Sequence, residues 1–124
     1  MPEQRESDAR LAGRLYATLR VLKFVADPHS GQRPTAEDEF GGKDSPHARI
    51  RALKLDLFED LVSAVQRGRN AEATAEVLRV LPSVVPSQRA ALHANLGERP
   101  LAEFNAGHRA QLASLREALP ELLG

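Results

Sequence analysis

The chain has no cysteine and no tryptophan, and its 124 residues include only one tyrosine and four phenylalanines. The absence of cysteine excludes disulfide bonds, thiolate nucleophiles and cysteine-ligated metal centres. Because aromatic residues are scarce, the core has to be built mainly from Leu, Val and Ala, which suits the packing of helix on helix.

The chain also has no net charge, since 17 basic residues balance 17 acidic ones. A neutral chain has no overall attraction to nucleic acid or to an anionic membrane, so the charge balance argues against both partners. Neutrality also lowers the electrostatic penalty for self-association. No apolar run reaches the roughly 18 residues that span a bilayer, and the N-terminus has no apolar signal-peptide segment. We therefore expect a cytoplasmic protein.

Residues 45–68 have the clearest helical pattern in the chain. Ser45 is a suitable N-cap and Pro46 a suitable first helical residue, and Gly68 can end the helix. Apolar residues recur at helical spacing and form one wide stripe. Because this helix is apolar on more than one side, we predict that it is the central helix of the fold. The stripe comprises Ile50, Leu53, Leu57, Leu61 and Val65, widened by Leu55, Phe58 and Val62.

Capping residues and apolar periodicity predict four further helices. No stretch has the pattern of a strand, and residues 1–7 form a polar, flexible tail. The predicted fold is therefore all-α: a single domain, 1–124, in which a compact bundle of four to five helices surrounds the central helix. Helices joined by short turns should lie antiparallel to each other. The further helices are predicted at 8–26, 71–81, 88–96 and 100–119.

The last predicted helix contains two residues that interrupt its pattern. Gly107 costs about 1 kcal/mol relative to Ala inside a helix, so we expect a kink or a close contact there. His108 occupies a position on the apolar stripe, where a hydrogen-bonded core residue or an interface residue is the ordinary case.

The connection over residues 27–46 is unusually long and contains three prolines and three glycines. Connections of this length are usually either functional or disordered. Basic residues open the following helix, where cations oppose the helix macrodipole. They therefore call for a partner, either the acidic residues of the loop or an anionic ligand. The candidate binding residues are His29, Arg33, His47, Arg49 and Arg51, and the loop acids are Glu37, Asp38, Glu39 and Asp44.

No motif of a known chemistry is present. The four histidines lack metal-ligand spacing, and no calcium loop, P-loop, dinucleotide fingerprint or nucleophile elbow occurs. We therefore predict no metal and no cofactor. The sequence favours a non-enzymatic role, although an active site assembled from scattered residues would leave no spacing signature.

Three functions remain open. The first is a protein–protein interaction or regulatory module, forming a homodimer through the first or last helix, since both helices have more apolar surface than one small bundle needs. The second is a transcriptional regulator that uses a helix-turn-helix over 71–97. Against it, residues 71–124 have five arginines and six glutamates, which leaves little attraction to phosphate. The third is an enzyme or small-ligand binder with a pocket under the 27–46 loop.

Overall fold

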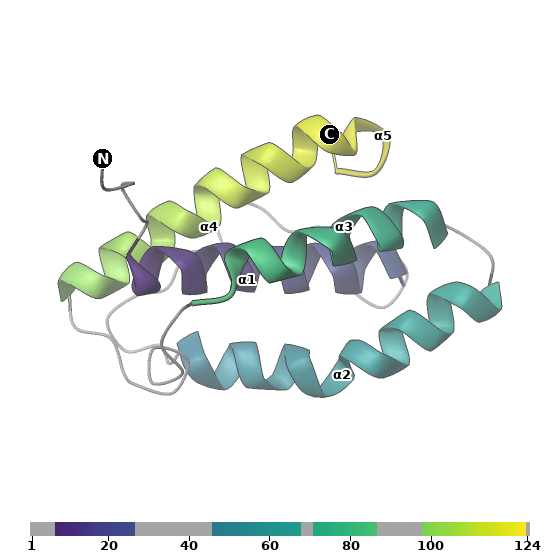
Figure 1. Cartoon of the computed structure of the whole chain (residues 1–124), viewed down its shortest axis with the longest axis horizontal. Helices are drawn as coiled ribbons and strands as arrows, with labels where there is room; N and C mark the ends of the chain where they lie inside the picture. The colour runs from purple at the N-terminus through teal and green to yellow at the C-terminus, as the bar shows by residue number, and fades with distance from the viewer. Residues whose placement is uncertain (1–6, 27–45, 68–70, 87–97, 124) are drawn as a thin grey trace.

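The computed structural model describes residues 7–26, 46–67, 71–86 and 98–123, and within these ranges it contains helices and no strand. The prediction of an all-α fold is confirmed. Four long helices pack along one another and a single short helix follows them (Figure 1). They are α1 (Asp8–Ala26), α2 (Pro46–Arg67), α3 (Ala71–Val84), α4 (Glu98–Ala118) and α5 (Pro120–Leu123).

The ends of α1 and α2 lie where the capping pattern predicts them. The Ser7 hydroxyl accepts a hydrogen bond from the backbone N–H of Arg10 at 3.1 Å, and the Ser7 carbonyl accepts one from Leu11 at 2.9 Å. Ser7 is therefore the N-cap of α1, which satisfies backbone donors that have no partner within the helix. The bounds of α2 equally match the helix predicted between Ser45 and Gly68.

Helices α3 and α4 each contain a proline. Pro82 lies inside α3, which continues to Val84, so the helix predicted over 71–81 is too short. The Ser83 hydroxyl donates to the Val80 carbonyl at 2.7 Å, within the turn that contains the proline. At the start of α4, Pro100 lies in the first turn, where a missing N–H costs no helical bond.

The central helix of the bundle is α1. It contacts α2, α3 and α4, and its most extensive contact is with α4. None of its residues is classed as exposed, and eleven of its nineteen residues are buried. The central position predicted for residues 45–68 is not confirmed, because α2 lies along one edge of the molecule (Figure 1).

Helices α1, α2 and α4 run in the same direction along the bundle (Figure 1). Tyr16 lies near Arg49 and Lys23 bonds Asp56, so residue numbers rise together along α1 and α2. Helices α2 and α3, joined by a short link, are antiparallel as predicted (Figure 1). Residues 27–45 thus connect the end of α1 with the start of α2 at the opposite end of the bundle. Since a 19-residue helix is about 28 Å long, this connection has to be long for topological reasons.

The two glycines of the described residues bring α1 and α4 into backbone contact. A Cβ atom on Gly13 would overlap the Phe104 carbonyl and lie 3.0 Å from the His108 nitrogen. A Cβ atom on Gly107 would overlap the Arg10 carbonyl. Each glycine therefore turns a Cα–H group toward a carbonyl of the other helix, a weak but recurring helix–helix contact. The close contact predicted for Gly107 is confirmed.

Apolar side chains fill the bundle in two clusters, one toward each end of α1. Val84 and Phe104 belong to the cluster around the first half of α1, whereas Val77 and Leu112 belong to the cluster around its second half. Leu123 of α5 is buried in the second cluster, so the short helix covers that end of the core. Most of the stabilising apolar burial therefore surrounds α1.

The glycine contact predicts an unusual response to an added methyl group. Gly107→Ala should destabilise the protein by about 2 kcal/mol or more, because overpacking outweighs the roughly 1 kcal/mol of helix propensity that alanine gains. Ala110→Gly, at an exposed position of the same helix, is the control and should cost only about 1 kcal/mol. Urea unfolding followed by circular dichroism measures both. A Gly107→Ala protein as stable as the parent would contradict the close crossing.

Candidate functional site

The largest exposed apolar feature of the described residues lies on α2. Leu55, Phe58 and Val65 are 73%, 74% and 75% exposed, and Val62 is 36% exposed. Their spacing of three, four and three residues places them on one face of a helix, in the pattern of a two-heptad coiled-coil seam. We call these four residues the outer stripe.

The opposite side of α2 provides its contact with the bundle. Ile50 and Ala64 are buried, and Leu53, Leu57 and Leu61 pack partly buried against the two core clusters. The single wide stripe predicted from the sequence is therefore two stripes, and Val65 belongs to the exposed one. α2 contacts α1 and, more weakly, α3. Its outer stripe is consequently left uncovered by the described part of the chain.

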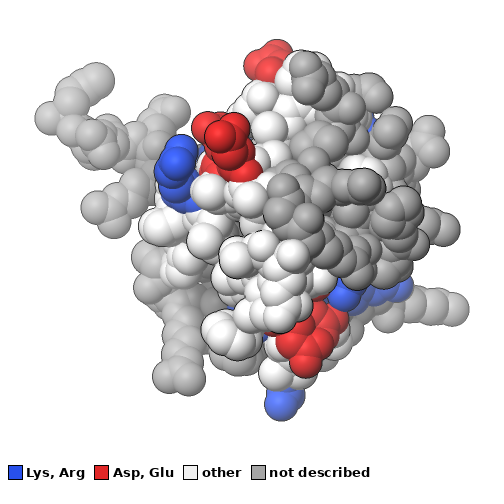
Figure 2. Space-filling view, turned by 90° about the vertical axis from the view of Figure 1, so that its right-hand side faces the viewer, with Lys and Arg blue, Asp and Glu red and all other residues white. Residues whose placement is uncertain are grey.

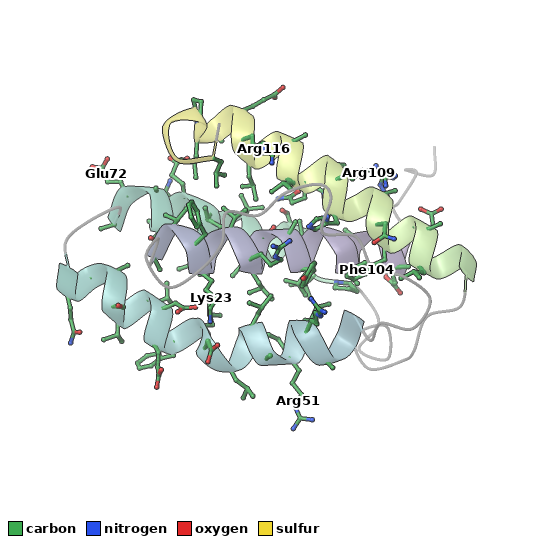
Figure 3. The ribbon with its side chains drawn as sticks, turned by 180° about the vertical axis from the view of Figure 1, so that it is seen from behind. Lys23, Arg51, Glu72, Phe104, Arg109 and Arg116 are labelled. Atoms are coloured by element: carbon green, nitrogen blue, oxygen red, sulfur yellow. The ribbon has the colours of Figure 1, made fainter. Side chains whose placement is uncertain are left out.

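Charged residues flank the outer stripe. With Leu55 and Val62 at heptad position a, Lys54 falls at position g and Glu59 at position e, and both are exposed. Arg51, one turn before Leu55, points away from the bundle (Figure 3). The face therefore combines an apolar centre with one basic and one acidic edge residue, as in helices that pair with other helices.

A pocket of about 210 Å³ opens between α1 and α2, on a different side of α2 from the outer stripe. Its walls are almost entirely apolar, and the described residues that line it include one arginine from each helix. The lining residues are Tyr16, Arg20, Arg49, Ala52 and Leu53.

Two aromatic residues contact the guanidinium group of Arg20, one of the residues that line the pocket. Its guanidinium carbon lies 5.4 Å from the centre of the Tyr16 ring, within the range of a cation–π interaction. Its Nη1 atom lies 3.4 Å from Nε2 of His108. Arginine can only donate, so this contact is a hydrogen bond when Nε2 of His108 has no proton. His108 is 1% exposed and packs 5.5 Å from the Tyr16 ring, which confirms its prediction as a core residue.

The structure separates the binding residues predicted from the sequence. Arg49 lines the pocket, whereas Arg51 does not, because residues two apart on a helix face different directions. His29 and Arg33 lie outside the described residues, as does the side chain of His47. Tyr16 and Arg20 were not predicted as site residues, although their spacing of four residues places them on one helix face.

The described residues cover only part of the predicted helix-turn-helix. Gln88, Arg89 and His93 of the proposed helix-turn-helix lie outside the described residues. On the face shown in Figure 2, the described basic and acidic side chains are scattered rather than gathered into a basic patch. Within the described ranges no three His, Asp or Glu residues are grouped as metal ligands, and none of the helices there is both long and apolar enough to cross a membrane.

The homodimer interface was predicted on the first or last helix, and the described residues of these helices expose little apolar surface. No residue of α1 is exposed and eleven of its nineteen residues are buried, so α1 leaves little apolar surface for a second chain. On α4, Phe104, Leu112 and Leu115 are buried, and the exposed described positions are small or polar residues. The large exposed apolar residues among those described are the outer stripe and Val85.

Comparison with known proteins does not assign the chain to a family. No family model matches it, and neither the curated proteins nor the solved structures give a significant match. Its function therefore has to be argued from its own geometry.

The burial pattern predicts opposite responses at two phenylalanines. Phe104→Ala should lose about 3–5 kcal/mol of stability, because Phe104 is 0% exposed and its removal leaves a cavity beside Tyr16. Phe58→Ala should change stability by less than about 0.5 kcal/mol in dilute protein, because its ring is already in water. Urea unfolding below micromolar concentration tests the pair. Comparable losses would mean that Phe58 is covered within the monomer.

Proposed function

We propose that this protein is a helical interaction module that forms a homodimer through the outer stripe of α2. The supporting observation is the exposure of Leu55, Phe58 and Val65 on one face of a helix that the rest of the bundle holds in place. Each Å² of apolar surface removed from water contributes about 25 cal/mol. A second helix against this face would cover the stripe.

The heptad positions of the stripe favour a second copy of α2 in parallel orientation. In a parallel pair, Lys54 at position g faces Glu59 at position e of the other copy, and the two-fold axis repeats this attraction. In an antiparallel pair the e positions face each other, so the two Glu59 carboxylates would meet near the centre and repel. Zero net charge adds no general repulsion between copies.

The stripe is short, and the dimer should be correspondingly weak. Residues 55–65 span about 15 Å along the helix, and an isolated coiled coil of two heptads would not pay the cost of ordering its helices. Here α2 is already held by its contact with α1. We therefore expect a concentration-dependent equilibrium between monomer and dimer, as is typical of regulatory contacts.

Removing the apolar centre of the stripe tests the surface. Phe58→Asp should remain monomeric, because a carboxylate would be buried without a partner. The parent protein should approach twice 13.6 kDa at high micromolar concentration in sedimentation equilibrium. Ala110→Asp adds the same charge at an exposed position of α4 and should dimerise like the parent. A parent that stays monomeric up to millimolar concentration contradicts the proposal.

Reversing the flanking charges tests the orientation. Glu59→Lys should weaken the parallel dimer severalfold, since two exposed ion pairs of about 0.2–1 kcal/mol each become repulsions. The double variant Lys54→Glu with Glu59→Lys should regain the parent's dissociation constant. These effects should fade at high salt. If Glu59→Lys dimerises as well as the parent, the parallel pairing is wrong even when the stripe itself is the interface.

A further inference from the structure

We propose that a multivalent oxyanion of the phosphate type regulates the α2 dimer by binding between its two copies of Arg51. The site depends on the dimer proposed above, because each copy supplies one guanidinium group. The monomer has only half of the site, and the ligand therefore controls the strength of the association.

Arg51 continues the heptad pattern of the outer stripe. With Leu55 at position a and Phe58 at position d, Arg51 occupies position d of the preceding heptad, so the spacing from 51 to 65 is four, three, four and three residues. Its side chain is exposed and points away from the bundle (Figure 3). Within the described part of the chain, no hydrogen bond or ion pair involves its guanidinium group, which leaves this group available to a ligand.

The parallel dimer brings the two Arg51 side chains together. In a parallel two-fold pair of helices, the equivalent d residues face each other across the axis. The two guanidinium groups would therefore lie beside each other at one end of the outer stripe, and their like charges would oppose pairing there. In an antiparallel pair the two groups would lie at opposite ends of the stripe, and no shared site would form.

The charges on this part of α2 select an anion. All charged residues from Ala48 to Leu55 are basic and exposed, namely Arg49, Arg51 and Lys54. The first acidic residue of α2 is Asp56, which already bonds Lys23 of α1 at 2.8 Å. This turn of α2 therefore contains no carboxylate of its own that could neutralise the facing pair.

A multivalent oxyanion fits two facing guanidinium groups better than a monovalent ion does. Each guanidinium group can donate two parallel hydrogen bonds to a pair of phosphate oxygens, so one anion can bridge both copies of Arg51. Chloride screens the repulsion but has no second oxygen to share. Because the anion binds the dimer more tightly than the monomer, it shifts the equilibrium toward the dimer.

Sedimentation equilibrium with inorganic pyrophosphate, at an ionic strength matched with sodium chloride, tests the site. Low millimolar pyrophosphate should lower the dimer dissociation constant of the parent at least about threefold. In chloride alone, Arg51→Gln should dimerise about twofold to threefold more tightly than the parent, because two facing charges are removed, and pyrophosphate should leave it unchanged. Arg79→Gln removes an exposed charge from α3 and should respond like the parent.

Failure of the anion site can be distinguished from failure of the dimer. If the parent and Arg51→Gln both stay monomeric in both salts, the outer stripe is not the interface, and the anion site falls with it. If the parent dimerises but pyrophosphate leaves it unchanged, or tightens Arg51→Gln equally, the anion site alone is wrong. A dimer weakened by Arg51→Gln in chloride would also overturn the site, because Arg51 would then be an attractive contact.

Discussion

The close approach of α1 and α4 at Gly13 and Gly107 is the constraint on which the rest of the structure depends. Any side chain at either position would overlap a backbone carbonyl of the other helix, so the two helices meet backbone to backbone. Around this point, Arg14 donates to Gln111 at 2.9 Å, and the Tyr16 ring lies 5.8 Å from that of Phe104. The α1–α4 pair therefore has a fixed register, against which the remaining helices pack.

This arrangement explains why α2 is the helix with an exposed apolar face. Since α4 already covers one side of α1 and α3 another, α2 can reach the core only through its inner face. One ion pair, between Lys23 and Asp56 at 2.8 Å, adds a polar link to α1 (Figure 3 shows Lys23 pointing toward α2). The outer stripe and the pocket both result from this one-sided attachment. The stripe lies on the side of α2 that faces away from the bundle, and the pocket lies beside the face that contacts α1.

Local sequence signals predicted individual helices well, and their arrangement poorly. The cap at Ser7 and the limits of α2 could be predicted because they depend on backbone groups within a few residues. The central position of α1 could not be predicted, because it depends on Gly13 and other small residues. Such residues contribute little to a hydropathy pattern. For the same reason Phe58 looked like core: periodicity shows that a face is apolar and does not show what covers it. Of the candidate site, Arg49 was found through its unfavourable place at a helix N-terminus, whereas Arg20 became visible only when α1 was placed beside α2.

The most direct test of the glycine crossing is an NMR measurement of distances between backbone protons. The structure predicts strong nuclear Overhauser effects between the α protons of Gly107 and Arg10, because the Arg10 Cα lies 3.1 Å from the position a Gly107 Cβ would occupy. It equally predicts contacts between the Gly13 α protons and backbone protons of residues 104–108. If both sets are absent while the helices α1 and α4 are intact, the two helices do not cross at the glycines, and the exposure of the α2 stripe loses its explanation.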